Sequence, residues 1–208
     1  MNSKYCYPDS VVLRNKLDLR EEEPLARAER KLVLIRLGEL KIRPVAGDFS
    51  ERHLRDIHFY LFQDLYEFAG QFRDEQLGKG FFRFASPLYF QDMFQELTRN
   101  LQNENYLQNM DKKLFSCRLA YYMAEWNVVH PFREGNGRAI REYIRTLALS
   151  GGYTLDWSRA DKEELYQATV QSIANTTHLT KVLYSLIVED EPNPVLIKKW
   201  QQYKNAAQ

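Results

Sequence analysis

Residues 128–142 read VVHPFREGNGRAIRE, and the interpretation of the whole chain starts from this stretch. A helix is expected to end at His130 and Pro131, where proline interrupts the regular hydrogen bonding of a helix. The triplet Gly135-Asn136-Gly137 follows, and its backbone can adopt the conformations of an anion-binding nest. A new helix is predicted directly after it. The free amides and the dipole at its N-terminus would favour a bound phosphate.

Two arginines in the predicted new helix suit a polyphosphate. Arg138 and Arg141 lie three residues apart in its first turn and therefore share one face. Guanidinium groups can bind phosphate oxygens bidentately. The opposite face is apolar and is expected to pack on the core through Ile140, Tyr143, Ile144 and Leu147.

An acid and an imidazole complete this set of residues. Glu134 supplies one hard oxygen ligand, and Mg²⁺ typically takes one or two carboxylates together with phosphate oxygens and waters. His130 remains as the titratable group, with an ordinary pKa of about 6.5. A phosphate cradle, a metal carboxylate, positive charge and a base are the parts that phosphoryl or nucleotidyl transfer requires. The residues alone therefore indicate that class of chemistry.

The remaining sequence predicts an all-α fold with one small β element. Glycines punctuate residues 70–87, and FFRFA at 81–85 favours an extended strand, so a short hairpin is expected there. Ser50 is the expected N-cap of the helix that follows it. Apolar side chains repeating every three to four residues predict helices at about 25–40, 51–66, 88–102, 111–129, 138–150, 160–173 and 178–188.

Composition restricts the function and the cellular location. The chain has 208 residues, and its 29 basic and 28 acidic side chains leave a net charge of +1. No strong field is present to attract nucleic acid or an anionic membrane, so neither partner is expected. Cys6 and Cys117 lie far apart, which fits a reducing cytoplasm, and Cys117 is expected to be buried.

The first 20 residues are polar and are interpreted as a loose arm. They show neither the basic-then-apolar pattern of a signal peptide nor an apolar run of the roughly 18–20 residues that a membrane span needs. A bacterial cytoplasmic location is therefore expected. A signal for a specialised secretion system would not be seen by this test, so delivery into a host cell stays open.

HPFREGNGRAIR at 130–141 resembles, residue for residue, the signature of the Fic family, His-x-Phe-x-Asp/Glu-Gly-Asn-Gly-Arg-x-x-Arg. IHFYLFQDLYEFAGQFR at 57–73 is similar to the helix and AGxxR segment of these proteins, and KGFFRFA at 79–85 to their flap hairpin. The resemblance implies a Fic-type domain of about six to eight helices with a short flap. Its expected extent is one domain over residues 1–208, with an arm at 1–20, a core at 50–175 and a tail at 190–208.

The resemblance also implies a function, which is transfer of AMP from ATP to a hydroxyl of a target protein bound along the flap. His130 would be the general base, Glu134 would hold Mg²⁺, and Phe132 would anchor the loop. Nucleotide-binding residues would come from the flap, the motif and the following helix: Lys79, Gly80, Phe82, Arg83, Phe84, Gly135, Asn136, Gly137, Arg138, Arg141 and Tyr166.

Alternatives remain open at this point. The same cradle could serve transfer of UMP, GMP or a phosphoryl group, because it contacts phosphates more than the base. A further hypothesis is that the chain is a catalytically silent nucleotide-binding module. His53, His58 and His178 show no ligand spacing and are expected to be structural or exposed, and Arg145 is expected to be solvated.

Regulation is also suggested by the resemblance. Many Fic proteins carry an inhibitory helix with the pattern Ser/Thr-x-x-x-Glu-Gly/Asn. Ser185 and Glu189 have this spacing, but Asp190 departs from it, and the match is interpreted as accidental. The chain then resembles the toxin-type members that are controlled by a separate small antitoxin protein carrying the inhibitory helix.

Overall fold

The computed structural model describes residues 3–206, and within them the chain forms eight α-helices and one two-stranded hairpin. The predicted all-α class with a small β element is confirmed. The bounds are α1 Glu22–Ile42, α2 Glu51–Phe62, β1 Gly78–Lys79, β2 Phe82–Arg83, α3 Phe90–Asn103, α4 Lys112–Val129, α5 Asn136–Ser150, α6 Lys162–Gln171, α7 Thr177–Leu186 and α8 Pro194–Asn205.

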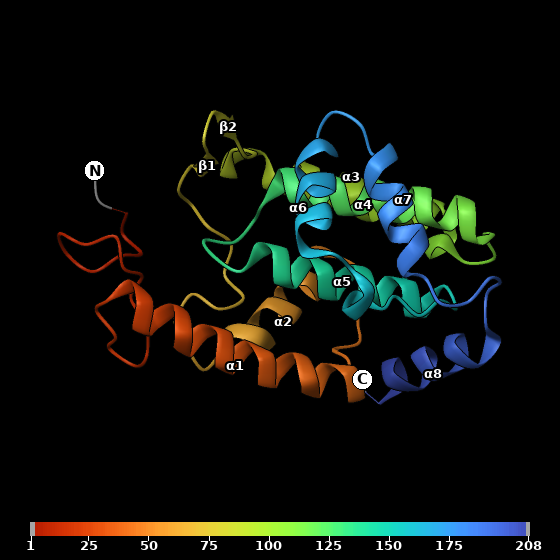
Figure 1. The fold of residues 1–208 in the computed structure, drawn as a ribbon, viewed down its shortest axis with the longest axis horizontal. Helices are drawn as coiled ribbons and strands as arrows, with labels where there is room; N and C mark the ends of the chain where they lie inside the picture. The colour runs from red at the N-terminus through yellow and green to blue at the C-terminus, as the bar shows by residue number, and fades with distance from the viewer. Residues whose placement is uncertain (1–2, 207–208) are drawn as a thin grey trace.

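Helix α5 runs through the middle of the molecule, with α1 and α2 on one side and α4, α6 and α7 on the other (Figure 1). It packs on α2, α4 and α8, while α7 packs on α4 and α6. The apolar face predicted for this helix is buried in these contacts. Its residues there are Ile140, Tyr143, Ile144 and Leu147, each at most 2% exposed.

The hairpin is the flap predicted from the sequence. Lys79 pairs with Phe82 and Gly78 with Arg83 in antiparallel register. Gly80 in the turn has a φ of +60°, a left-handed conformation that glycine adopts without a Cβ penalty. The strands are only two residues long and leave Phe81 fully exposed at the tip. The flap therefore depends on contacts at its base for its position.

The N-terminal segment does not form the loose arm expected from its polar composition. The backbones of Cys6 and Leu13 form an isolated antiparallel β-bridge, which closes a small loop. Ser3 Oγ donates to a carboxylate oxygen of Glu75 at 2.6 Å, and Lys4 and Tyr5 both contact Asp74. This segment is therefore docked on the loop that leads into the flap, through contacts between residues about 70 positions apart in the chain.

Other elements differ from the predictions in detail. Cys117 is exposed, so the prediction that it is buried is wrong, whereas Cys6 is buried. Ser50 occupies the N-cap of α2, but its hydroxyl bonds Asp48 and not the helix amides. The tail forms α8, which begins at Pro194 with Asn193 as a capping residue. Across residues 3–206, none of the helices combines the length and apolarity that crossing a membrane requires.

Candidate active site

The loop between α4 and α5 is shaped by two left-handed residues. His130 closes α4 with φ 48° and ψ 59°, while its amide still donates to Trp126 O at 3.0 Å. Gly135 has a φ of +80°, and a Cβ at this position would lie 2.2 Å from the ring of Phe62. The chain can therefore turn here only with glycine, because both the backbone conformation and the contact exclude a side chain.

Phe132 and Asn136 fix the inside of this loop. Phe132 is completely buried, as the anchoring role predicted for it requires. The Asn136 side chain accepts from Phe132 N at 2.8 Å and donates to Phe132 O at 2.7 Å. Asn136 was expected to contribute to an anion hole. Its side-chain amide instead bonds within the loop. Among the described residues, the backbone amides of Asn136 and Gly137 have no backbone acceptor and are therefore available to a ligand.

His58 supports the loop from α2. Its ring stacks on Phe132 with centroids 3.8 Å apart. Gly70 N donates to Nδ1 at 2.9 Å, so Nε2 must carry the proton that is donated to Glu134 O, also at 2.9 Å. Burial lowers the pKa of His58 to about 4, so the ring is neutral at neutral pH. The prediction that this histidine is structural is confirmed.

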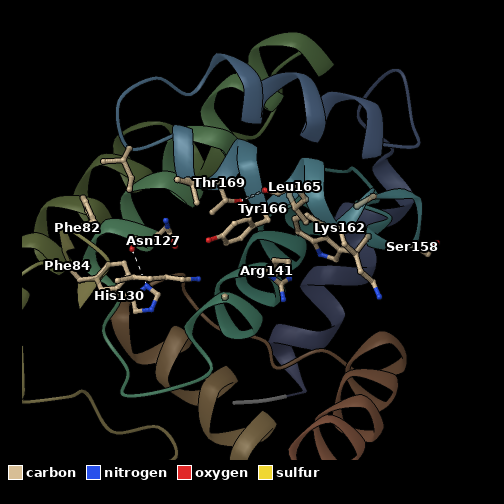
Figure 2. Close-up of a pocket in the computed structure, with 16 residues that line it drawn as sticks. Phe82, Phe84, Asn127, His130, Arg141, Ser158, Lys162, Leu165, Tyr166 and Thr169 are labelled. Atoms are coloured by element: carbon tan, nitrogen blue, oxygen red, sulfur yellow. Dashed lines mark hydrogen bonds between the residues drawn. The ribbon is translucent and has the colours of Figure 1, made fainter. Parts of the chain in front are cut away.

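A cavity of about 750 Å³ opens between this loop, the flap and α6. In the view of Figure 2, His130 and Phe84 lie at one end, Lys162 and Ser158 at the other, and Arg141 and Tyr166 between them. Seven of the predicted site residues line it: Lys79, Phe82, Phe84, His130, Gly137, Arg141 and Tyr166. The other five, Gly80, Arg83, Gly135, Asn136 and Arg138, lie outside its lining, as does Glu134.

The His130 imidazole is half-buried at the wall of this cavity. It stacks on Phe84, and its Nδ1 lies 3.3 Å from Asn127 O. A carbonyl oxygen can only accept, so Nδ1 carries the proton and Nε2 has a free lone pair. Burial lowers the pKa of His130 to about 4, and the positive charges of Arg73 and Lys79 act in the same direction. The hydrogen bond to Asn127 O raises the pKa and offsets part of this effect. At neutral pH the imidazole of His130 is therefore neutral and can accept a proton at Nε2.

The two motif arginines have different surroundings. Arg141 lines the cavity, and a Cβ on Gly137 would lie 3.3 Å from its Nη1, so its guanidinium lies beside the start of α5. Burial and the charge of Arg138 lower the pKa of Arg141. Arg138 instead pairs with Glu29 of α1 at 2.6 Å and with Glu134 at 3.4 Å. Within the part of the chain that is described, Arg141 has no ion pair, so its guanidinium is available to an anionic ligand, alongside Lys79 and Lys162, which line the same cavity.

Glu134 was predicted to hold a metal ion, and its surroundings restrict what it could hold. One carboxylate oxygen, Oε1, accepts from Gly135 N at 2.8 Å and faces Arg138 Nη2. Residues 3–206 contain no cluster of three or more His, Cys, Asp or Glu side chains arranged for a metal. A single carboxylate fits Mg²⁺ only where phosphate oxygens and waters complete the octahedron. The donor set is therefore compatible with a metal that enters together with a nucleotide.

The flap and α6 meet across the mouth of the cavity. Lys79 Nζ lies 4.9 Å from the centre of the Tyr166 ring, which is a cation–π contact. Tyr166 was predicted from its distance past the motif, and the structure places it on the wall that faces the flap. This contact adds a link between the flap and α6 to the contacts at the base of the hairpin.

Sequence reasoning missed several residues of this wall. Asn127 precedes the motif, and the remainder belong to α6 and to the turns on either side of it. They are polar and apolar residues of ordinary type, and only their helical spacing after residue 160 could have suggested one face. The missed residues are Asn127, Trp157, Ser158, Ala160, Lys162, Leu165, Thr169, Val170 and Ile173.

Arg145 is not solvated as expected. It donates to both carboxylate oxygens of Glu142, at 2.8 and 2.6 Å, and to Leu40 O at 3.0 Å. Glu142 is buried, so this pair joins α5 to the end of α1 inside the fold. The stripe of arginines on α5 is therefore divided. Arg141 faces the cavity, and Arg145 faces the packing of α1.

The segment with inhibitory spacing lies away from the cavity. Glu189 accepts from the amide and the hydroxyl of Thr154, at 2.6 and 2.7 Å. Ser185 Oγ donates to Val182 O in its own helix. Neither residue lines the cavity that contains Arg141. The interpretation of this match as accidental agrees with these contacts.

Residues 48–148 match the model of the Fic/DOC family. The chain is 36% identical over 182 residues to protein adenylyltransferase VbhT of Bartonella schoenbuchensis; this covers 88% of the chain but only 38% of that longer relative. It is 32% identical over 186 residues to the probable protein adenylyltransferase Fic of Escherichia coli, which covers 89% of the chain and 92% of that relative.

Solved structures show the same fold. The N-terminal Fic domain of a VirB-translocated Bep effector from Bartonella quintana, with bound ADP, superposes with a TM-score of 0.84 at 24% identity and covers 95% of the chain and 99% of that domain. BepC from Bartonella tribocorum, with bound AMPPNP, gives a TM-score of 0.82 at 22% identity over 92% of the chain and 99% of that structure. At these identities the likeness is one of fold.

Proposed function

Because the chain belongs to the Fic/DOC family, we propose that its cavity transfers AMP from ATP to a hydroxyl side chain of a target protein, with His130 as the general base. The enzyme class, protein adenylyltransferase, is carried by relatives of that name that match most of this chain at 36%, 32% and 35% identity. One structural observation supports the residue assignment. His130 and Arg141 line the same cavity, and Arg141 takes part in none of the ion pairs of residues 3–206.

The phosphates of the nucleotide would lie at the start of α5. Among the residues that the structure describes, the amides of Asn136 and Gly137 have no backbone acceptor, and the helix dipole favours negative charge. Arg141 lies beside this turn and can bind phosphate oxygens bidentately. The adenosine would then extend toward the wall that α6 and the preceding turn form, where Tyr166 and Trp157 offer aromatic surface.

Mg²⁺ would be held by Glu134 together with phosphate oxygens and would neutralise negative charge that develops on them. Arg138 is already paired with Glu29 and Glu134, so its role in this proposal is twofold. It would hold the Glu134 carboxylate next to the phosphates and add positive charge behind it. This differs from Arg141, which would contact the phosphates directly.

The transfer step follows from the protonation state of His130. Nε2 would take the proton of the target hydroxyl as the oxygen forms a bond to the α-phosphorus of ATP. The bond between that phosphorus and the oxygen bridging to the β-phosphate breaks, and pyrophosphate leaves with the electron pair. A general base typically contributes about 10²–10⁴ in rate. The fixed positive charges around the phosphates supply electrostatic stabilisation of the transition state.

The target segment would pair with the flap in an extended conformation. The edges of β1 and β2 carry backbone groups suited to adding a strand, and Phe81 at the tip offers apolar surface. The cavity lies directly under this hairpin, so a hydroxyl on a paired segment would be delivered to the His130 end.

Inhibition is proposed to come from a separate small protein with an inhibitory helix. Glu189 is held by Thr154 and therefore offers no carboxylate to Arg141. A bacterial cytoplasmic location fits such a toxin and antitoxin pair. The alternative location is a host cell, and it is supported by the fold shared with effectors that are described as VirB-translocated.

The test is intact mass spectrometry of bacterial lysate proteins after incubation with the chain, ATP and Mg²⁺. The proposal predicts a recipient protein whose mass rises by one adenosine monophosphate residue. The same incubation with His130→Ala is expected to leave the recipient unmodified, while the variant keeps its fold because His130 is only half-buried. Gain of a phosphoryl group, or full labelling by the variant, would overturn the proposal.

A further inference from the structure

Arg73 has an unusual environment for a charged side chain. It is 2% exposed, and none of the ion pairs of residues 3–206 includes it. Its guanidinium donates instead to four backbone carbonyls. The acceptors are Glu75 O at 2.6 Å, Ala85 O at 2.7 Å, His130 O at 2.8 Å and Val129 O at 3.2 Å.

These four carbonyls belong to separate parts of the proposed site. Glu75 lies just before the flap, Ala85 lies just after it, and Val129 and His130 end α4. Backbone bonds reinforce the same junction, with Ala85 N donating to Val128 O at 3.0 Å. One side chain therefore ties both ends of the flap to the turn that presents the imidazole.

The electrostatics explain why a cation can be accommodated here. The last carbonyls of a helix lack intrahelical donors and carry the negative end of its dipole, so a cation at this end is stabilised. The guanidinium also lies 4.9 Å from the centre of the Phe90 ring. Burial lowers the pKa of Arg73 to about 10, so the group remains charged at neutral pH.

We infer that Arg73 is a positioning residue for AMP transfer, which fixes the flap and the His130 turn relative to one another. The inference deepens the proposed function and rests on it. A target segment paired with the flap would reach the imidazole at a distance that Arg73 sets. Displacement of reacting groups by about 1 Å can lower a rate by about 10²-fold, so this junction controls transfer.

Arginine is required at position 73 because the four carbonyl acceptors lie in different directions from the side chain. Its planar guanidinium presents five donors in a rigid fork, whereas a lysine ammonium has three donors on one atom. A lysine at this position keeps the charge but cannot bond both ends of the flap and the His130 turn. The phosphate side of the cavity is held by other contacts, namely those of His58, Asn136 and Arg138. A change at Arg73 should therefore separate transfer from nucleotide binding.

The experiment compares Arg73→Lys with Arg55→Lys. Arg55 is the control for the same substitution at a more exposed site nearby, because it donates to Gly70 O at 2.8 Å and lies over the Phe72 ring, neither of which belongs to the flap or the His130 turn. Binding is measured calorimetrically with α,β-methylene ATP, whose α–β bridge cannot be cleaved. Transfer is measured as the initial rate of label from α-labelled ATP, at saturating nucleotide, into the acceptor band that the wild-type chain labels.

Arg73→Lys is expected to lose about 10²-fold in transfer rate while its affinity for α,β-methylene ATP is unchanged. Arg55→Lys is expected to change neither quantity. A wild-type transfer rate in Arg73→Lys, or a loss of nucleotide affinity that matches the loss of rate, would overturn the inference. Absence of α-label transfer by the wild-type chain would instead defeat the proposed function itself, so the two failures are distinguishable.

The native protein offers a second measurement that needs no substitution. The amides of Arg73, Ala85 and His130 donate to Pro131 O, Val128 O and Trp126 O. If one junction holds the flap and the turn, residue-resolved hydrogen exchange should give these three amides a common opening free energy. Protection at His130 with rapid exchange at Ala85 would overturn the inference even if the Arg73 variant did not fold.

Discussion

The phenyl ring of Phe84 lies flat against the imidazole of His130, with ring centroids 3.7 Å apart and planes inclined by 11°. Phe84 follows β2 of the flap, and His130 ends α4, so the contact joins the two elements directly. Because Asn127 O engages Nδ1, the stack also fixes the direction of Nε2. The flap therefore orients the proposed base in addition to covering the cavity.

Replacing Phe84 with leucine should slow transfer without unfolding the chain. An aromatic stack contributes about 0.5–1.5 kcal/mol beyond buried area, so a loss of about two- to tenfold in transfer rate is expected. The rate of labelling from α-labelled ATP measures it. Phe81→Leu, at the exposed tip of the same hairpin, is the matched control when the target is saturating, because Phe81 is proposed to contact the target and its loss should then leave the rate unchanged. Equal rates for wild type and Phe84→Leu would show that the stack does not orient the base.

The pH dependence of transfer should reflect the depressed pKa of His130, which lies at about 4. The base works in its neutral form, so kcat/KM should be constant at neutral pH and fall only as pH drops toward this value. Lys79 carries one of the positive charges that depress the pKa, and Lys79→Gln should therefore move the midpoint upward. A wild-type midpoint at the ordinary value of about 6.5 would contradict this environment for the imidazole.

Glu29 should matter although it lies outside the segment that matches the family model. It pairs with Arg138 at 2.6 Å and accepts from the Tyr66 hydroxyl, and its side chain is only 14% exposed. Glu29→Gln should lower the free energy of unfolding by about 1–3 kcal/mol, because it leaves Arg138 without its buried partner. Urea denaturation measures this change.

The matched control for Glu29 is Glu23→Gln on the same helix, where the pair with Arg27 is exposed on both sides. Exposed pairs contribute little, so no measurable change in stability is expected there. Equal effects of the two substitutions would show that the Glu29 contact does not stabilise the site.

Removing the carboxylate at position 189 should not activate the enzyme. Glu189 bonds Thr154 in the segment after α5 and does not reach the cavity. Glu189→Gly should therefore leave the self-modification rate of the isolated chain unchanged. The lost bonds to Thr154 should lower the free energy of unfolding only modestly. A large rise in self-modification, followed with α-labelled ATP, would show that the inhibitory element is internal after all.

The sequence was sufficient where local geometry decides the structure. Gly135 and Gly137 around the bend, and the apolar stripe of α5, specify a turn followed by an amphipathic helix within a dozen residues. The flap was predictable for the same reason, since Gly80 permits the left-handed turn and short extended runs flank it. These features depend on neighbours in the chain, which a pattern can report.

Long-range pairing could not be read from the chain. Arg73 meets carbonyls of residues 129 and 130, Glu29 meets Arg138, and His58 meets the loop at Glu134. Backbone carbonyl acceptors leave no signature in a sequence, and a single acid on a helix resembles any solvated charge. Arg145 was misjudged for that reason, because the backbone carbonyl of Leu40 in α1 accepts from its guanidinium.

The most direct test of the central claim uses ATP labelled at either the α- or the γ-position, incubated with the chain, Mg²⁺ and a bacterial lysate. The account predicts that label reaches the acceptor protein only from the α-position and that His130→Ala abolishes this transfer. Label arriving only from the γ-position would contradict adenylylation, and undiminished α-label transfer by His130→Ala would show that another group is the base.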